Sequence, residues 1–126
     1  MTTYVAQTKW NGADVELRLW LDDRAELPAA LDAARKLWTN QGSWNNRIHE
    51  QVISELLPLK SQNWQEDDGS TVTRDEFLNR MKLKSITLRA DGSFDVCYDD
   101  GDLFWGHEIV VYGQIGEGIR SAGIQG

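Results

Sequence analysis

Cysteine, proline, histidine and basic residues are all scarce in this chain of 126 residues. The single cysteine, Cys97, excludes an internal disulfide, and its place in an apolar stretch predicts a buried strand residue. The first residues lack the basic and apolar regions of a secretory signal, and no apolar run approaches the ~18 residues of a membrane span. We therefore expect a cytoplasmic protein that does not bind a membrane.

The shortage of basic residues sets the charge of the chain. Lys and Arg number 13 against 20 Asp and Glu, which gives a formal net charge of -7. A basic surface supplies most of the non-specific affinity for phosphate, so this charge argues against nucleic acid as a partner. The length and the globular composition, with 40% hydrophobic residues, predict a single domain over residues 1–126.

Motifs for catalysis and for metal or phosphate binding are also missing. The only histidines are His49 and His107, and no pair of ligands has the spacing of a zinc site. An EF-hand loop starting at Asp95 fails because Cys97 stands at its third position and Asp100 at its sixth. Walker-type glycine loops and a serine nucleophile elbow are absent as well. The sequence predicts no metal, no cofactor and no catalytic residue.

The chain opens with the pattern of a β-hairpin. Apolar and polar residues alternate from Tyr4 to Trp10 and again from Val15 to Leu21, on either side of Asn11-Gly12. Asn-Gly tolerates the positive φ angles of a type I′ turn. We expect two antiparallel strands here.

The middle of the chain has helical periodicity. Apolar residues recur at helical spacing over residues 27–38 and 44–57, and the second helix is expected to end at Pro58. Thr73 and Glu76 form a capping box for a short third helix. The pattern predicts two to three helices between the hairpin and the last part of the chain.

From Ser85 onward the period returns to two. Asp-Gly turns at residues 91–92 and 100–102 separate strands, and residues 103–112 are expected to form a central strand. The glycine-rich tail, residues 113–126, either adds a weak strand or frays. The whole pattern predicts an α+β fold, in which the C-terminal antiparallel strands form one sheet with the N-terminal hairpin.

The six tryptophans divide into two groups. Four fall within the expected sheet and helices, whereas Trp64 lies in a polar loop and Trp105 lies beside an acidic turn. Exposed aromatic residues in an acidic surface are typical anchors of protein interfaces, where carboxylates steer a basic partner. The candidate binding residues are Trp64, Asp99, Asp100, Asp102, Trp105, His107 and Glu108.

The last third of the chain carries a family resemblance. Residues 86–94 form a strand and an Asp-Gly turn, and residues 100–109 read Asp-Gly-x-x-Phe-x-Gly-His-x-Ile. This order resembles the C-terminal signature of a bacterial family of uncharacterised proteins. The resemblance implies a stand-alone cytosolic protein, with some members in settings like those of toxin immunity proteins, and it brings no catalytic residue.

Three hypotheses follow for function. The first is a non-enzymatic domain that binds another protein through an acidic, tryptophan-bearing surface, as an immunity protein neutralising a basic toxin would. The alternative is a small hydrolase or ligand-binding enzyme in which His107 is the acid or base, oriented by Asp102 or Glu108. The third is a subunit of a homo-oligomer paired through an edge strand. The sequence leaves the oligomeric state open.

Overall fold

The structure is a computed structural model and describes residues 2–66 and 68–126. Within these residues, six strands form one sheet whose spatial order is their order along the chain. Neighbouring strands are antiparallel except β2 and β3, which are parallel. The strands are β1 (Thr2–Trp10), β2 (Ala13–Leu21), β3 (Lys82–Arg89), β4 (Ser93–Asp99), β5 (Glu108–Gln114) and β6 (Gly118–Gln125).

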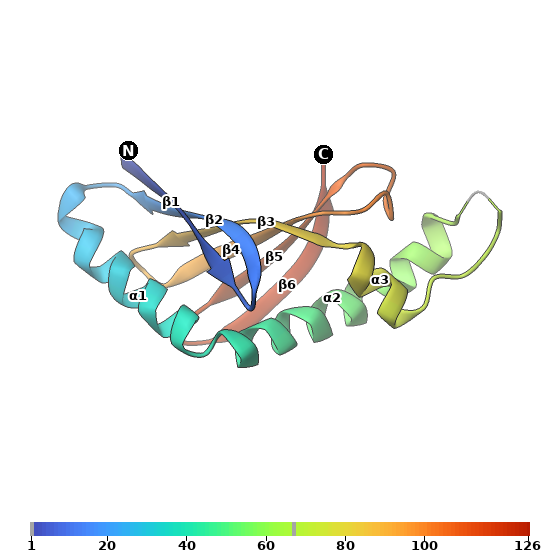
Figure 1. Ribbon diagram of the computed structural model, residues 1–126, viewed down its shortest axis with the longest axis horizontal. Coiled ribbons are helices and arrows are strands. Elements are labelled where there is room, and N and C mark those ends of the chain that lie inside the picture. Colours follow the sequence, from blue (N-terminus) through green and yellow to red (C-terminus); the bar gives the residue numbers. More distant parts are fainter. Residues whose placement is uncertain (1, 67) are drawn as a thin grey trace.

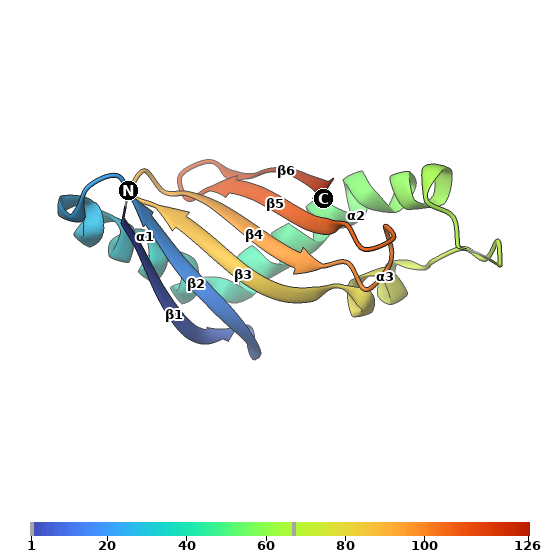
Figure 2. The same cartoon turned by 90° about the horizontal axis from the view of Figure 1, so that it is seen from above.

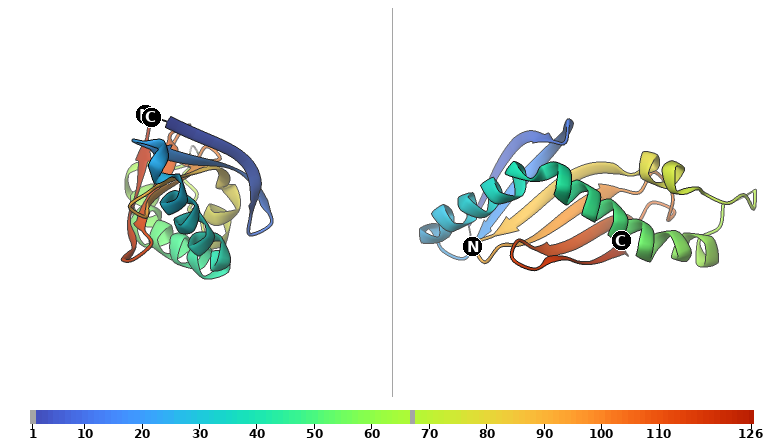
Figure 3. Two further views of the ribbon diagram at one scale, coloured as in Figure 1. Left: turned by 90° about the vertical axis from the view of Figure 1, so that its left-hand side faces the viewer. Right: turned by 90° about the horizontal axis from the view of Figure 1, so that it is seen from below.

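Helices lie on one face of this sheet and leave the other face open (Figures 1 and 2). The helices are α1 (Leu27–Thr39), α2 (Gln41–Asn63) and α3 (Arg74–Arg80), with a short 3-10 turn, η1 (Arg24–Glu26), before α1. The right-hand view of Figure 3 shows α1 and α2 crossing the sheet in succession. Because this crossing returns the chain to the side where β2 began, β3 joins β2 in parallel. The predicted α+β class, with the hairpin and the C-terminal strands in one sheet, is confirmed.

The Asn11-Gly12 turn forms as expected. Asn11 has φ 50° and Gly12 has φ 88°, the left-handed conformations that a type I′ turn requires. The register runs from Trp10 opposite Ala13 to the far ends of both strands without a shift. The side chain of Trp20 is 40% exposed on the open face, so it is not part of the core.

Helix α2 covers the sheet with a stripe of side chains spaced four residues apart. The buried members of this stripe are Trp44, Ile48, Val52, Leu56 and Lys60. Trp44 packs edge-on against Phe94 of β4, with ring centroids 5.4 Å apart. No helix in the described residues is long and apolar enough to cross a membrane.

The expectation that the second helix ends at Pro58 is wrong, because α2 continues to Asn63. Proline removes one backbone donor and usually breaks a helix. Here the helix continues because Lys60 is buried in the stripe and ion-paired with Glu66. The backbone N–H of Trp64 closes the last turn by donating to the Lys60 carbonyl at 3.1 Å. The short third helix forms as predicted, and the Glu76 N–H donates to the Thr73 hydroxyl at 3.2 Å.

The last strands differ from expectation at one point. The chain does not enter a strand at Leu103, because residues 101–106 form a turn and β5 begins only at Glu108. Asp102 and Trp105 have positive φ angles of 66° and 58°, which a strand does not allow. The tail forms β6, which pairs along β5 and packs against α2, so of the two alternatives for this segment the strand is correct.

Candidate functional site

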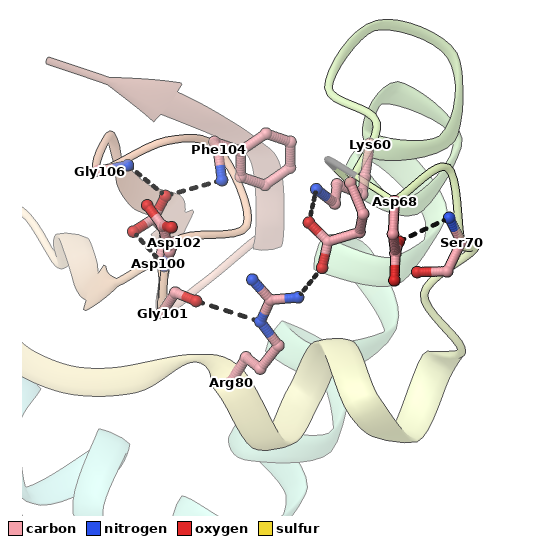
Figure 4. Close-up of polar contacts among 10 residues, drawn as sticks. Lys60, Asp68, Ser70, Arg80, Asp100, Gly101, Asp102, Phe104 and Gly106 are labelled. Carbon is pink, nitrogen blue, oxygen red and sulfur yellow. Dashed lines mark hydrogen bonds and ion pairs between the residues drawn. The ribbon is translucent and has the colours of Figure 1, made fainter.

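The turn between β4 and β5 is built around the carboxylate of Asp100. Asp100 is 2% exposed, and its carboxylate accepts from the N–H groups of Asp102 at 3.0 Å, Phe104 at 2.8 Å and Gly106 at 3.1 Å. Figure 4 shows the last two bonds converging on one oxygen. Three charge-assisted hydrogen bonds, all accepted by this carboxylate, hold the backbone of the turn in a single conformation.

This turn presents Trp105 to solvent. The Trp105 side chain is 61% exposed, the largest exposed fraction among the exposed large hydrophobic residues described. A left-handed backbone is uncommon for a bulky side chain and costs about 1 kcal/mol, so the surrounding contacts must impose it. The hydrogen bonds of Asp100 on both sides of Trp105 supply that constraint.

Aromatic contacts connect Trp105 to the core. Its ring lies edge-on to Trp64, with centroids 4.6 Å apart, and Trp64 lies 5.8 Å from Phe104. Phe104 is fully buried and lies 5.9 Å from Phe77 of α3. His107 also packs on Trp64, with ring centroids 5.1 Å apart. Trp64 and Trp105, far apart in sequence, therefore form one cluster that runs from the core to the surface.

An ion network behind this cluster ties it to the helices. Glu66 accepts from Lys60 at 2.9 Å and from Arg80, and Arg80 donates through Nε to the Gly101 carbonyl at 3.1 Å (Figure 4). Lys60 is 2% exposed, and Glu66 is the charged partner of its buried ammonium. Hydrogen bonds from Lys60 and Arg80 hold the pKa of Glu66 below its usual value. The network joins α2, α3 and the turn that carries Trp105.

Two of the predicted acidic residues, Asp99 and Asp102, are exposed in this turn. Asp99 accepts from the Gly101 N–H at 3.0 Å and keeps its carboxylate at the surface. The segment from residue 99 to residue 107 contains no Lys or Arg. Asp100, in contrast, is buried, so it supports the turn and does not belong to the exposed acidic surface.

The structure separates Glu108 from the tryptophan cluster. Its carboxylate accepts from the thiol of Cys97 and lies 3.4 Å from the Lys84 ammonium, and both of these residues line the open face of the sheet. The hydrogen bond from Cys97 lowers the pKa of Glu108. Cys97 is a strand residue of β4, as expected, but it is not fully buried: its side chain is partly exposed and its thiol donates to Glu108.

The environment of Cys97 keeps it protonated. Burial, and then the hydrogen bond and the charge of Glu108, raise the pKa of the Cys97 thiol to about 12. A reactive thiolate needs a lowered pKa. Cys97 is therefore a thiol at neutral pH.

The geometry gives no pairing of His107 with a carboxylate. His107 Nδ1 lies 2.7 Å from the Phe104 carbonyl oxygen, which can only accept, so Nδ1 carries the proton. Among the hydrogen bonds of the described residues, none joins the His107 ring to Asp102 or Glu108. The imidazole instead forms a hydrogen bond with the backbone of the turn and packs on Trp64.

The open face holds a shallow groove of about 480 Å³, and Trp105 is not among the residues that line it. The charged groups that line it are paired: Arg18 with Glu16 at 2.5 Å, Lys84 with Glu108 at 3.4 Å, and Asp95 with Arg89 outside the groove at 2.8 Å. Charges that are already paired leave little net field for a charged ligand. Among the described residues, no group of three or more Asp, Glu, His or Cys is placed to hold a metal ion.

The sequence patterns do not predict the ion network, although one residue, Lys60, indicates a buried charge. Lys60 continues the four-residue spacing of the apolar stripe of α2, and a lysine at such a position must find a buried partner. Its two partners in the network, Glu66 and Arg80, belong to other segments. No local pattern connects these segments.

The fold and the cluster define an α+β protein with one open sheet face and an exposed tryptophan held rigidly at the end of the sheet. The family model described as "Uncharacterized protein conserved in bacteria (DUF2262)" matches residues 1–124. The chain belongs to this family, which confirms the expected membership of an uncharacterised bacterial family. No curated protein and no solved structure matches the chain.

Proposed function

We propose that this protein is a binding domain that recognises a basic protein through the surface formed by Trp64, Trp105, Asp99 and Asp102, here termed the Trp105 surface. We further propose that the partner is a toxin that this protein neutralises in the cytoplasm, as immunity proteins do.

The exposure of Trp105 in an imposed backbone conformation carries this proposal. An exposed indole costs free energy in water, and this one is 61% exposed on a turn that three hydrogen bonds hold. Rigid aromatic side chains lose little entropy on binding and are enriched among the residues that dominate interface energetics. A preorganised Trp105 therefore suits an anchor for a pocket on a partner.

The acidic residues around Trp105 indicate that the partner is positively charged. Asp99 and Asp102 lie at the two ends of the segment before Trp105 and are exposed, and the cations of the network behind the cluster, Lys60 and Arg80, are already bound to Glu66. Lys82 of β3 lies opposite Asp99 in the sheet, so Asp102 is the carboxylate on which the proposal mainly depends. Carboxylates at the rim of an interface accelerate association with a basic partner. The net charge of -7 extends this attraction to longer range.

The test is binding to the basic product of an adjacent toxin-like gene, measured by calorimetry at physiological salt. Replacing Trp105 with Ala should weaken binding by roughly 30-fold, the usual effect of losing a central aromatic anchor. Asp102→Asn should mainly slow association and reduce its dependence on salt. Trp20→Ala is the matched control, because Trp20 is 40% exposed on the open sheet face.

The toxin role has its own readout. Co-expression of this protein should restore growth to cells that produce the toxin, and Trp105→Ala should lose that protection. An adjacent toxin-like protein that does not bind at physiological salt, or binding that Trp105→Ala leaves unchanged, would contradict the proposal.

A further inference from the structure

The two edges of the sheet differ in how they are covered. At one edge, α2 packs along β6, and the Ala122 N–H donates to the carboxylate of Glu55 at 2.6 Å. At the other edge lies β1, the outermost strand in Figure 2, and α1 contacts it at its Trp10 end, where the Trp10 and Trp38 ring centroids lie 5.0 Å apart. The left-hand view of Figure 3 shows the β1–β2 hairpin projecting away from the helices.

The register shows which backbone groups of β1 are free. In a two-residue hairpin, the residues that flank the turn, Trp10 and Ala13, exchange both of their hydrogen bonds. Alternation then directs the N–H and C=O groups of Thr3, Val5 and Gln7 away from β2. The next outward residue, Lys9, is already used, because the Trp38 indole donates to its carbonyl at 2.8 Å. Three successive outward-facing residues remain.

This edge also lacks the features that prevent strand pairing. Free edges are normally protected by proline, by a charge in the middle of the strand, by a bulge or by a covering segment. The sequence from Thr3 to Gln7 contains neither proline nor a charged residue, and the β1–β2 register has no irregularity. A regular, uncharged edge of this kind is suited to accept another strand.

Exposed apolar side chains gather at the same edge. Tyr4 is 37% and Val5 is 56% exposed on β1, and Trp20, which lies opposite Thr3 on β2, is 40% exposed. These are three of the five large hydrophobic side chains that are exposed among the described residues. The unpaired backbone groups of β1 and the exposed apolar side chains therefore lie at the same edge of the sheet.

We propose that a second copy of this chain pairs with the β1 edge, strand against antiparallel strand, with Val5 on the two-fold axis. In this register Val5 lies opposite Val5 of the other copy, and Thr3 lies opposite Gln7 in both directions. Each of the three free residues thus finds its partners, and the two sheets become one continuous sheet. Pairing of the edge also gives Tyr4 and Val5, which point to opposite faces of the sheet, a cross-strand neighbour each that covers part of the side chain.

The geometry limits the assembly to a dimer. A contact of one surface with itself closes after two copies, and the opposite edge, β6, is covered by α2. The charges of the hairpin do not oppose the contact. Lys9 pairs with Asp14 and Arg18 pairs with Glu16, so the net charge of the chain is carried elsewhere.

The test is the mass in solution, measured by sedimentation equilibrium over a range of concentrations. The wild-type protein should reach twice the chain mass of 14.3 kDa. Val5→Pro should sediment as a single chain, because it removes the outward N–H and leaves the hydrogen bonds to β2 intact. Loss of the two central hydrogen bonds should raise the dissociation constant by roughly 30-fold or more.

Val5→Thr is the matched control, since it keeps the N–H and the β-branched side chain and should remain dimeric. Circular dichroism shows whether Val5→Pro is folded. If it is not, hydrogen exchange in the wild-type protein decides, because the amides of Thr3, Val5 and Gln7 should be protected only in the dimer. A single-chain mass at all concentrations, rapid exchange of these amides, or a folded Val5→Pro dimer would overturn the proposal.

The dimer and the proposed binding function can be tested independently of each other. Trp105→Ala should leave the dimer mass unchanged, since the Trp105 surface does not include β1. Val5→Pro should leave binding of the basic partner unchanged for the same reason.

Discussion

The Lys60 ammonium lies 2.9 Å from a carboxylate oxygen of Glu66 and is itself 2% exposed. Glu66→Gln should therefore destabilise the protein by about 2 kcal/mol, because a buried cation loses its charged partner while water reaches the site from the Glu66 side. Urea unfolding measures this change. Lys60→Met is the matched control and should cost less, since it removes the buried charge. If Glu66→Gln lowered the free energy of unfolding no more than an exposed control such as Glu117→Gln, the prediction would be contradicted.

The same ion pair predicts a dependence on pH. Hydrogen bonds from Lys60 and Arg80 lower the pKa of Glu66 in the folded protein from its ordinary value of 4.5. A lowered folded-state pKa contributes stability above the ordinary value, and this contribution is lost as the pH falls below it. The difference in unfolding free energy between wild type and Glu66→Gln should therefore narrow below pH 4.5. A difference that stays constant on acidification would contradict this assignment.

Asp100→Ala should loosen the turn that carries Trp105. The substitution leaves three N–H groups without their acceptor, among them that of the fully buried Phe104, and should cost about 3 kcal/mol. Thermal unfolding measures the loss, and quenching of tryptophan fluorescence reports the mobility of the turn. Asp99→Asn is the exposed control and should change stability by less than about 1 kcal/mol. A stable Asp100→Ala protein would show that the turn does not depend on this carboxylate.

Cys97 should react slowly with thiol reagents. Its pKa is raised from 9.0 to about 12, which lowers the thiolate population near neutral pH roughly a thousandfold. The rate of alkylation in the folded protein, compared with the rate in urea, measures this difference. Glu108→Gln should speed the reaction, because the charge and hydrogen bond of Glu108 raise the pKa of Cys97. Equal rates in the folded and unfolded protein would contradict the raised pKa.

Gly113 is required by its contact with Phe94. A Cβ at Gly113 would overlap the Phe94 ring, which is buried in the core beneath β5. Gly113→Ala should therefore destabilise the protein by about 2 kcal/mol, the usual cost of overpacking a core. Gly123→Ala on β6 is the matched control, since a Cβ there has no atom within 4 Å. The two variants should differ clearly in urea midpoint, and similar midpoints would contradict the role of the contact.

The parts of the fold that the sequence predicts correctly depend on local chemistry. Asn11-Gly12 forms its turn because both residues tolerate positive φ, and Thr73 caps α3 because its hydroxyl accepts from the Glu76 N–H, one of the two bonds of the expected capping box. The end of α2 could not be predicted in this way. Helix α2 continues past Pro58 where Lys60 extends its buried stripe and pairs with Glu66, which also binds Arg80 of α3.

In the candidate site, too, some features can be predicted from the sequence and others depend on the fold. The contact between Trp64 and Trp105 joins the two tryptophans that the sequence places outside the expected sheet and helices, and the structure puts Trp64 at the end of α2. The role of Asp100 depends on where its side chain points, because a carboxylate in an acidic turn looks the same in sequence whether it is buried or exposed. Glu108 adjoins His107 in sequence but faces Cys97, because Glu108 is the first residue of β5, whereas His107 precedes the strand and its ring lies against the Phe104 carbonyl of the turn.

The parallel pairing of β2 with β3 sets an order for folding during synthesis. Glu16 lies opposite Ser85, so more than half of the chain separates the two sides of this contact. The N-terminal hairpin forms from neighbouring residues and can do so early, whereas its attachment to the rest of the sheet waits until β3 has left the ribosome. During that interval the apolar faces of α1 and α2 have only the hairpin to cover them. Production of this protein should therefore be more sensitive to chaperone supply than its size alone would indicate.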